Sequence, residues 1–135
     1  MTKNVCLLLL IASCAVLAGC SKDAEIDAFI TELDSITTDM VSKIDADPSA
    51  AGIDAAQKIY DSRKPELQSK WDAIKGARGF QVSEDAKKKL EQSLTKNISA
   101  LSGAMIKNAM KLASDPGARD KFQKLVKDYT DTFSP

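Results

Sequence analysis

The stretch from Asp23 to Pro48, DAEIDAFITELDSITTDMVSKIDADP, decides the architecture of the chain. Its large apolar residues recur at steps of three or four, at Ile26, Ile30, Leu33, Ile36 with Thr37, Met40 and Ile44. Because an α-helix has 3.6 residues per turn, this spacing draws one apolar stripe along a helix. The sequence therefore predicts a helix over 23–46. Asp47 is the predicted N-cap of the next helix and Pro48 its first residue.

A second amphipathic segment follows over about 53–74. Its apolar face is formed by Ile53, Ala56, Ile59 with Tyr60, Leu67, Trp71 and Ile74. Pro65 interrupts it, because proline has no N–H to donate and crowds the carbonyl of Asp61. We expect a kink there, or two short helices that meet near Ser62. Gly76 and Gly79 then end the segment.

Two more helices are predicted in the second half of the chain. Ser83 is the expected N-cap of a long one. Its stripe is formed by Leu90, Leu94, Ile98, Leu101, Met105, Ala109 and Leu112. Asp115-Pro116 starts the last helix, whose stripe is formed by Ala118, Phe122, Leu125 with Val126, Tyr129 and Phe133. No segment alternates as a strand does, so we expect an all-α fold, a small antiparallel four-helix bundle made of two helical hairpins.

Opposite charges gather on the first and third predicted helices. The first is rich in acidic residues, among them Asp27, Asp34 and Asp45, and the third carries Lys89, Lys96, Lys107 and three other lysines. We expect these two helices to be neighbours, although exposed ion pairs contribute only about 0–1 kcal/mol each. Burial of the apolar stripes should provide most of the stability. No polar residue stands on a stripe in a way that predicts a ligand pocket.

The first twenty residues differ from the rest. Val5 to Ala18 is a run of fourteen uncharged residues behind Lys3, and the chain's three cysteines, Cys6, Cys14 and Cys20, all fall within this region. A membrane-spanning helix needs about 20 apolar residues. A run of this length is typical of the apolar centre of a secretory signal peptide.

Leu17-Ala18-Gly19-Cys20, at the end of this run, resembles the lipobox of bacterial lipoproteins. The resemblance implies cleavage between Gly19 and Cys20, with residues 1–19 as signal peptide and residues 20–135 as a lipid-anchored helical domain. Cys20 would carry a diacylglyceryl group with palmitate-type chains, and membrane lipid would be its partner. Cys6 and Cys14 would leave with the signal peptide, so no disulfide is expected. Ser21 in place of Asp implies the outer membrane, on the face toward the periplasm.

Residue types that carry catalysis are scarce in the remaining chain. It has no histidine, and its acidic residues lie on the polar faces of the predicted helices. No glycine-rich phosphate loop is present. We therefore expect no enzyme activity, no metal and no cofactor. The formal net charge is zero, which disfavours a nucleic-acid partner.

Arg78 and Phe80 are the candidates for contact with a partner. They fall in the predicted loop over 76–82, where no helical stripe accounts for an aromatic residue. The alternative is that Phe80 folds back and covers the end of the bundle. Trp71 stands close to the second stripe, so we expect it in the core.

These patterns predict a non-catalytic binding or structural module, anchored by lipid in the bacterial cell envelope and contacting an envelope protein. One alternative is a self-associating helical lipoprotein similar to the small trimeric lipoprotein of enteric outer membranes, whose Cys-Ser start and heptads this chain resembles. Pro48, Pro65 and Pro116 interrupt a continuous coiled coil, and the chain has no terminal lysine for attachment to the cell wall. Another is a periplasmic bundle that carries a small ligand or acts as a chaperone.

Overall fold

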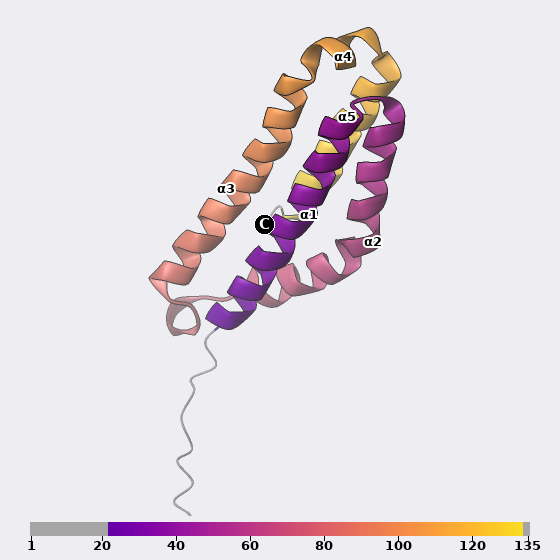
Figure 1. Cartoon of the computed structure of the whole chain (residues 1–135). Helices are drawn as coiled ribbons and strands as arrows, with labels where there is room; N and C mark the ends of the chain where they lie inside the picture. Colours follow the sequence, from indigo (N-terminus) through magenta and orange to yellow (C-terminus); the bar gives the residue numbers. More distant parts are fainter. Residues whose placement is uncertain (1–21, 134–135) are drawn as a thin grey trace, which may run out of the picture.

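Helices make up all the regular structure of residues 22–133, the part of the chain that the computed structural model describes (Figure 1). In chain order the elements are α1 (Asp23–Ala46), α2 (Ala50–Ile74), the short 3-10 helix η1 (Gly79–Gln81), α3 (Glu84–Lys107), α4 (Ala109–Ser114) and α5 (Pro116–Thr132). The prediction of an all-α fold is confirmed. The first helix has the predicted bounds.

The apolar stripe of α1 is the centre of the core. Its fully buried side chains are Ile26, Phe29, Leu33, Ile36, Met40 and Ile44. An aromatic cluster joins this stripe to α2 and α5. The ring of Phe29 lies 5.5 Å from that of Trp71 and 5.8 Å from that of Phe133, and the Tyr129 ring lies 5.1 Å from Phe133. The expected core position of Trp71 is confirmed.

The helices are not all antiparallel to their neighbours. α1 packs against both α2 and α3, and α2 packs against α5. α1 and α2 run antiparallel, since Trp71 late in α2 meets Phe29 early in α1. α1 and α3 run parallel (Figure 1), and successive ion pairs between them join residues that are 62 positions apart. α2 and α5 are also parallel, because the contacts Asp54–Lys121 and Tyr60–Asp128 join residues 67 and 68 positions apart. The bundle thus contains the antiparallel hairpin α1 with α2 and two parallel pairs, α1 with α3 and α2 with α5.

The turn between α1 and α2 differs from its prediction. Ser49, not Asp47, is the N-cap of α2, and its hydroxyl accepts the Ala51 N–H. Asp47 ends α1 instead, and its carboxylate accepts the Ser49 N–H at 3.1 Å. The turn is tight enough to require glycine at position 52, because a Cβ there would lie 1.8 Å from the Asp47 carbonyl oxygen.

Pro65 lies inside α2, which remains one helix from Ala50 to Ile74. Figure 1 shows that α2 bends strongly along its length, as the prediction of a kink requires. The bend follows from the missing proline N–H, since the Asp61 carbonyl loses its partner within the helix.

The buried face of α3 is also displaced from the predicted stripe. Ser93 and Asn97 are buried together with Leu101, whereas Ile98 is exposed. The predicted long helix ends at Lys107, because the Asn108 side chain bonds to the Ala104 carbonyl and to Asp45 of α1. Polar side chains that face α1, together with the apolar residues, therefore determine which face of α3 is buried.

This orientation predicts unequal effects of two neighbouring truncations. Leu101→Ala should lower the free energy of unfolding by about 2–5 kcal/mol, because it removes fully buried methyl groups and leaves a cavity. Ile98→Ala should cost less than about 1 kcal/mol, since this side chain is 37% exposed. Urea unfolding of both variants measures the difference. A larger loss for Ile98→Ala would place the predicted stripe, and not the observed one, in the core.

Candidate functional site

The loop that carries the predicted contact residues is built by glycine and by local hydrogen bonds. Gly79 has a φ of 59°, a left-handed conformation that favours glycine. The Arg78 N–H donates to the Gln81 side chain at 3.2 Å across the single turn of η1. Val82, directly after η1, is buried and joins the loop to the core. The loop from Gly76 to Val82 is hereafter called the η1 loop.

Phe80 projects fully into solvent. It is 99% exposed, the largest exposure among the large hydrophobic residues described. The alternative that Phe80 folds back to cover the bundle's end is therefore wrong. The reason is that Gly79 turns the chain outward while Val82, two residues later, takes the buried position.

Arg78 has a different role from Phe80. Its guanidinium Nη1 donates to the Lys75 carbonyl at 3.0 Å and to the Ala77 carbonyl at 2.9 Å. Both carbonyls follow the last turn of α2, where the helix leaves acceptors without an intrahelical donor. Arg78 thus holds the η1 loop against the end of α2.

The η1 loop is bonded to the start of α1. The Lys22 N–H donates to the Gln81 carbonyl at 2.7 Å, and the Ser83 N–H donates to an Asp23 carboxylate oxygen at 3.0 Å. These bonds bring together segments about sixty residues apart in the sequence, as the lower end of the bundle in Figure 1 shows. Phe80 therefore lies beside the point where the chain enters the bundle.

A groove of about 370 Å³ opens behind the loop. Its walls are apolar, and its rim is charged; the lining includes Ile26, Trp71, Ile74, Val82, Leu90, Lys75, Arg78, Lys87 and Glu91. The indole N–H of Trp71 is buried and has no hydrogen-bond partner within residues 22–133. That nitrogen is covered and therefore adds no polar atom to the open groove, whose walls are apolar and whose rim is charged.

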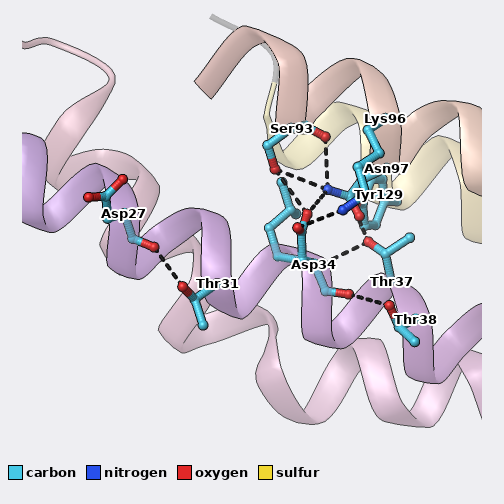
Figure 2. Close-up of polar contacts among 10 residues, drawn as sticks. Asp27, Thr31, Asp34, Thr37, Thr38, Ser93, Lys96, Asn97 and Tyr129 are labelled. Atoms are coloured by element: carbon cyan, nitrogen blue, oxygen red, sulfur yellow. Dashed lines mark hydrogen bonds and ion pairs between the residues drawn. The ribbon is translucent and has the colours of Figure 1, made fainter. Parts of the chain in front are cut away.

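A polar cluster lies between α1 and α3, centred on Asp34 (Figure 2). Its carboxylate accepts hydrogen bonds from Lys96 Nζ at 2.8 Å, Asn97 Nδ2 at 2.6 Å and Ser93 Oγ at 3.0 Å. Nearby, the hydroxyls of Thr37 and Tyr129 lie 2.7 Å apart and connect α1 to α5. The Asp34 carboxylate is thus held by three donors of one neighbouring helix.

Asp45 repeats this arrangement further along the same helices. It accepts from Lys107 Nζ at 2.6 Å and from Asn108 Nδ2 at 3.0 Å. Asp45 stands eleven residues after Asp34, and Lys107-Asn108 stands eleven residues after Lys96-Asn97. Eleven residues make about three helical turns, so both sets lie on nearly the same face. We call these two sets the Asp–Lys–Asn clamps.

The clamps change the ionisation of their carboxyl groups. At Asp34, desolvation opposes ionisation, but the hydrogen bonds from Lys96, Asn97 and Ser93 outweigh it and hold the pKa below its ordinary value. At Asp45, the hydrogen bond from Lys107 is the main cause of a lowered pKa. Both groups are therefore ionised at neutral pH and occupied in bonds that join the helices.

Sequence reasoning identified the clamps only in part. The expected pairing of the acidic first helix with the lysines of the third is confirmed by ion pairs at Lys89, Lys96 and Lys107. The asparagines were missed: Asn97 is 2% exposed and lies on the buried face of α3, where no apolar stripe predicted it. The repeated Lys-Asn dipeptide, in step with the Asp34 to Asp45 spacing, is the signal that could have found them.

Other residues of the predicted site lie outside the part that the structure describes. Gly19 and Cys20 are among them, so their processing and acylation stay predictions. Over residues 22–133, no group of three or more His, Cys, Asp or Glu side chains is arranged to hold a metal ion. No helix in that range is long and apolar enough to cross a membrane.

Comparison of the chain with protein-family models, with curated proteins and with solved structures gives no match in any of the three. The site is therefore interpreted from its own chemistry.

The clamps predict a pH-dependent contribution to stability. Asp34→Ala should lower the free energy of unfolding by about 1–3 kcal/mol at neutral pH, because it leaves buried donors on Asn97 and Ser93 with fewer partners. The folded-state pKa of Asp34 is lowered, so its contribution is present above the ordinary value of 3.8 and is lost as the pH falls below it. Urea unfolding at pH 7 and at about pH 3 should show the variant's deficit shrinking.

Asp27→Ala is the matched control on the same helix. Its partner Lys89 lies 3.7 Å away and both side chains are more than half exposed. It should cost less than about 1 kcal/mol. An equal loss for Asp27→Ala and Asp34→Ala, or a deficit for Asp34→Ala that does not change with pH, would contradict the role given to the clamps.

Proposed function

We propose that this chain is a lipid-anchored, non-catalytic binding or structural module of the bacterial cell envelope. The observation that carries the proposal is Leu17-Ala18-Gly19-Cys20, a lipobox-like sequence at the end of an uncharged run. Acylation of Cys20 would give the chain at least two lipid chains, enough for stable attachment. Ser21 favours the outer membrane, with the bundle in the periplasm.

The position of α1 supports this proposal. The helix begins at Asp23, three residues after Cys20, so the bundle would stand directly at the membrane without a long linker. With 24 residues, α1 is about 36 Å long. A bundle of that length, projecting from its anchor, offers its sides and far end to an envelope protein.

The chemistry of the acidic residues supports a non-catalytic role. General acid–base catalysis needs a carboxyl group that can reach a substrate and exchange a proton near neutral pH. Asp34 and Asp45 have lowered pKa values and accept hydrogen bonds from side chains of α3 and of its C-cap Asn108. Their arrangement fits stabilisation of the helix pair.

The burial of α1 disfavours the trimeric coiled-coil alternative. In a coiled coil, the apolar stripe of each helix packs against the stripes of other chains. Here Leu33, Ile36 and Met40 are fully buried in the core of the same chain, where α1 packs against α2 and α3. A trimer through α1 would require this bundle to open.

Lipid labelling tests the proposal directly. In bacteria fed a labelled fatty acid, the chain should carry the label, and Cys20→Ala should abolish it and leave an uncut precursor. Cys14→Ala should be labelled and cut normally, because that residue would leave with the signal peptide. Label that persists in Cys20→Ala would refute anchoring at this residue.

The oligomeric state separates the proposed module from the self-associating alternative. Since α1 is buried within its own bundle, the lipidated protein in detergent should have the protein mass of one chain. Size-exclusion chromatography with light scattering, corrected for the detergent, measures that mass. A mass of three chains would favour the trimeric lipoprotein instead.

A further inference from the structure

Large hydrophobic side chains with more than three quarters of their surface exposed occur at two places within residues 22–133: Phe80 on the η1 loop, and Ile106 with Met110 around the α3–α4 break. We propose that the η1 loop is a membrane-contact loop whose Phe80 enters the lipid interface beside the anchor. The proposal rests on the proposed acylation of Cys20. It assigns Phe80 a lipid partner in place of an envelope protein.

The first support is the distance along the chain between the anchor and the loop. Cys20 stands two positions before Lys22, so at most about 7 Å of extended chain separates them. The Lys22 N–H is bonded to the Gln81 carbonyl at 2.7 Å, and Gln81 directly follows Phe80. A lipid chain on Cys20 that enters the bilayer therefore brings Phe80 to the headgroup region.

The second support is that the loop presents Phe80 in a fixed, outward position. Bonds from Arg78 to the Lys75 and Ala77 carbonyls, and from the Arg78 N–H to Gln81, hold both ends of the turn. Phe80 is 99% exposed, which leaves a whole aromatic ring in water when no surface covers it. Phenylalanine is one of the residues that amphipathic segments place at the boundary between headgroups and acyl chains.

The third support is that the lysines flanking the loop are paired with acidic residues. Lys75 is paired with Asp72 at 2.6 Å, and Lys87 is paired with Glu84 at 2.6 Å. Arg78 is the one cation within the loop from Gly76 to Val82 and bonds to backbone carbonyls. The surface therefore requires no anionic lipid, and its contact with a membrane should depend on the apolar ring.

Tryptophan fluorescence can locate position 80 relative to the bilayer. The chain has one tryptophan, Trp71, whose buried N–H has no partner in the described bundle, so Trp71→Phe gives a host without tryptophan. Into this host we would introduce Phe80→Trp or, as matched control at the other exposed apolar position, Met110→Trp. The lipidated proteins are reconstituted in zwitterionic phosphatidylcholine vesicles, with and without brominated acyl chains.

The expected result is a shift of Phe80→Trp emission to shorter wavelength on reconstitution, with strong quenching by lipids brominated near the headgroup. The Met110→Trp emission should stay that of a solvent-exposed tryptophan and escape quenching. Emission from Phe80→Trp that is unchanged and unquenched, while the protein floats with the vesicles, would overturn the membrane-contact loop and leave the anchor intact. A protein that carries no acyl chain and does not float would overturn both proposals.

A second pair of variants covers the case in which the Trp71→Phe host does not fold. An environment-sensitive fluorophore on Phe80→Cys or Met110→Cys, with Trp71 retained, gives the same comparison, because acylation occupies the thiol of Cys20. The label at position 80 should respond to lipid and the label at position 110 should not. Equal responses at both positions would overturn the proposal.

Discussion

Asp34 and Asp45 each bind a lysine of α3 and the asparagine that follows it, Asn97 in α3 and Asn108 at its C-cap, with donor–acceptor distances of 2.6–3.0 Å. Because the two clamps are eleven residues apart on both helices, they can be made together only when α1 and α3 run parallel and in this register. An apolar stripe tolerates a shifted or reversed neighbour far better than a buried amide does, since an unpaired buried polar group costs about 1–3 kcal/mol. Burial of the stripes provides the stability of the bundle, and the clamps select the arrangement.

A parallel pair of helices needs a connection that returns the chain to the end from which it started. Here α2, which contains Pro65, provides that return, and its bend turns it across that end of the bundle (Figure 1). The return places the η1 loop beside the start of α1, where Lys22 bonds to Gln81 of the loop and Asp23 bonds to the adjacent Ser83. The position of Phe80 next to the proposed lipid anchor is thus a consequence of the parallel pairing.

Local patterns in the sequence were enough to predict the helices but not their mutual directions. The stripe of α1, the caps at Ser83 and Asp115, and the aromatic face of α5 follow from residue spacing and capping chemistry. The buried face of α3 does not follow from spacing. Asn97 is buried and bonds to Asp34, whereas a search for apolar periodicity treats asparagine as a surface residue. The exposure of Phe80 likewise depends on the left-handed Gly79, and spacing alone could not distinguish an outward ring from one that covers the bundle's end.

The central claim is that α1 and α3 are parallel, and a pair of distances between spin labels tests it most directly. With the native cysteines replaced by serine, one label is placed on Ala28 of α1, and the second on Lys88 or on Ile106 of α3, all exposed positions. Lys88 and Ile106 are about 27 Å apart along the helix, from about 1.5 Å per residue. The parallel pair predicts a distance from Ala28 to Lys88 that is shorter than the distance to Ile106 by about 10 Å or more. A shorter distance to Ile106 than to Lys88 would show an antiparallel pair and contradict the account.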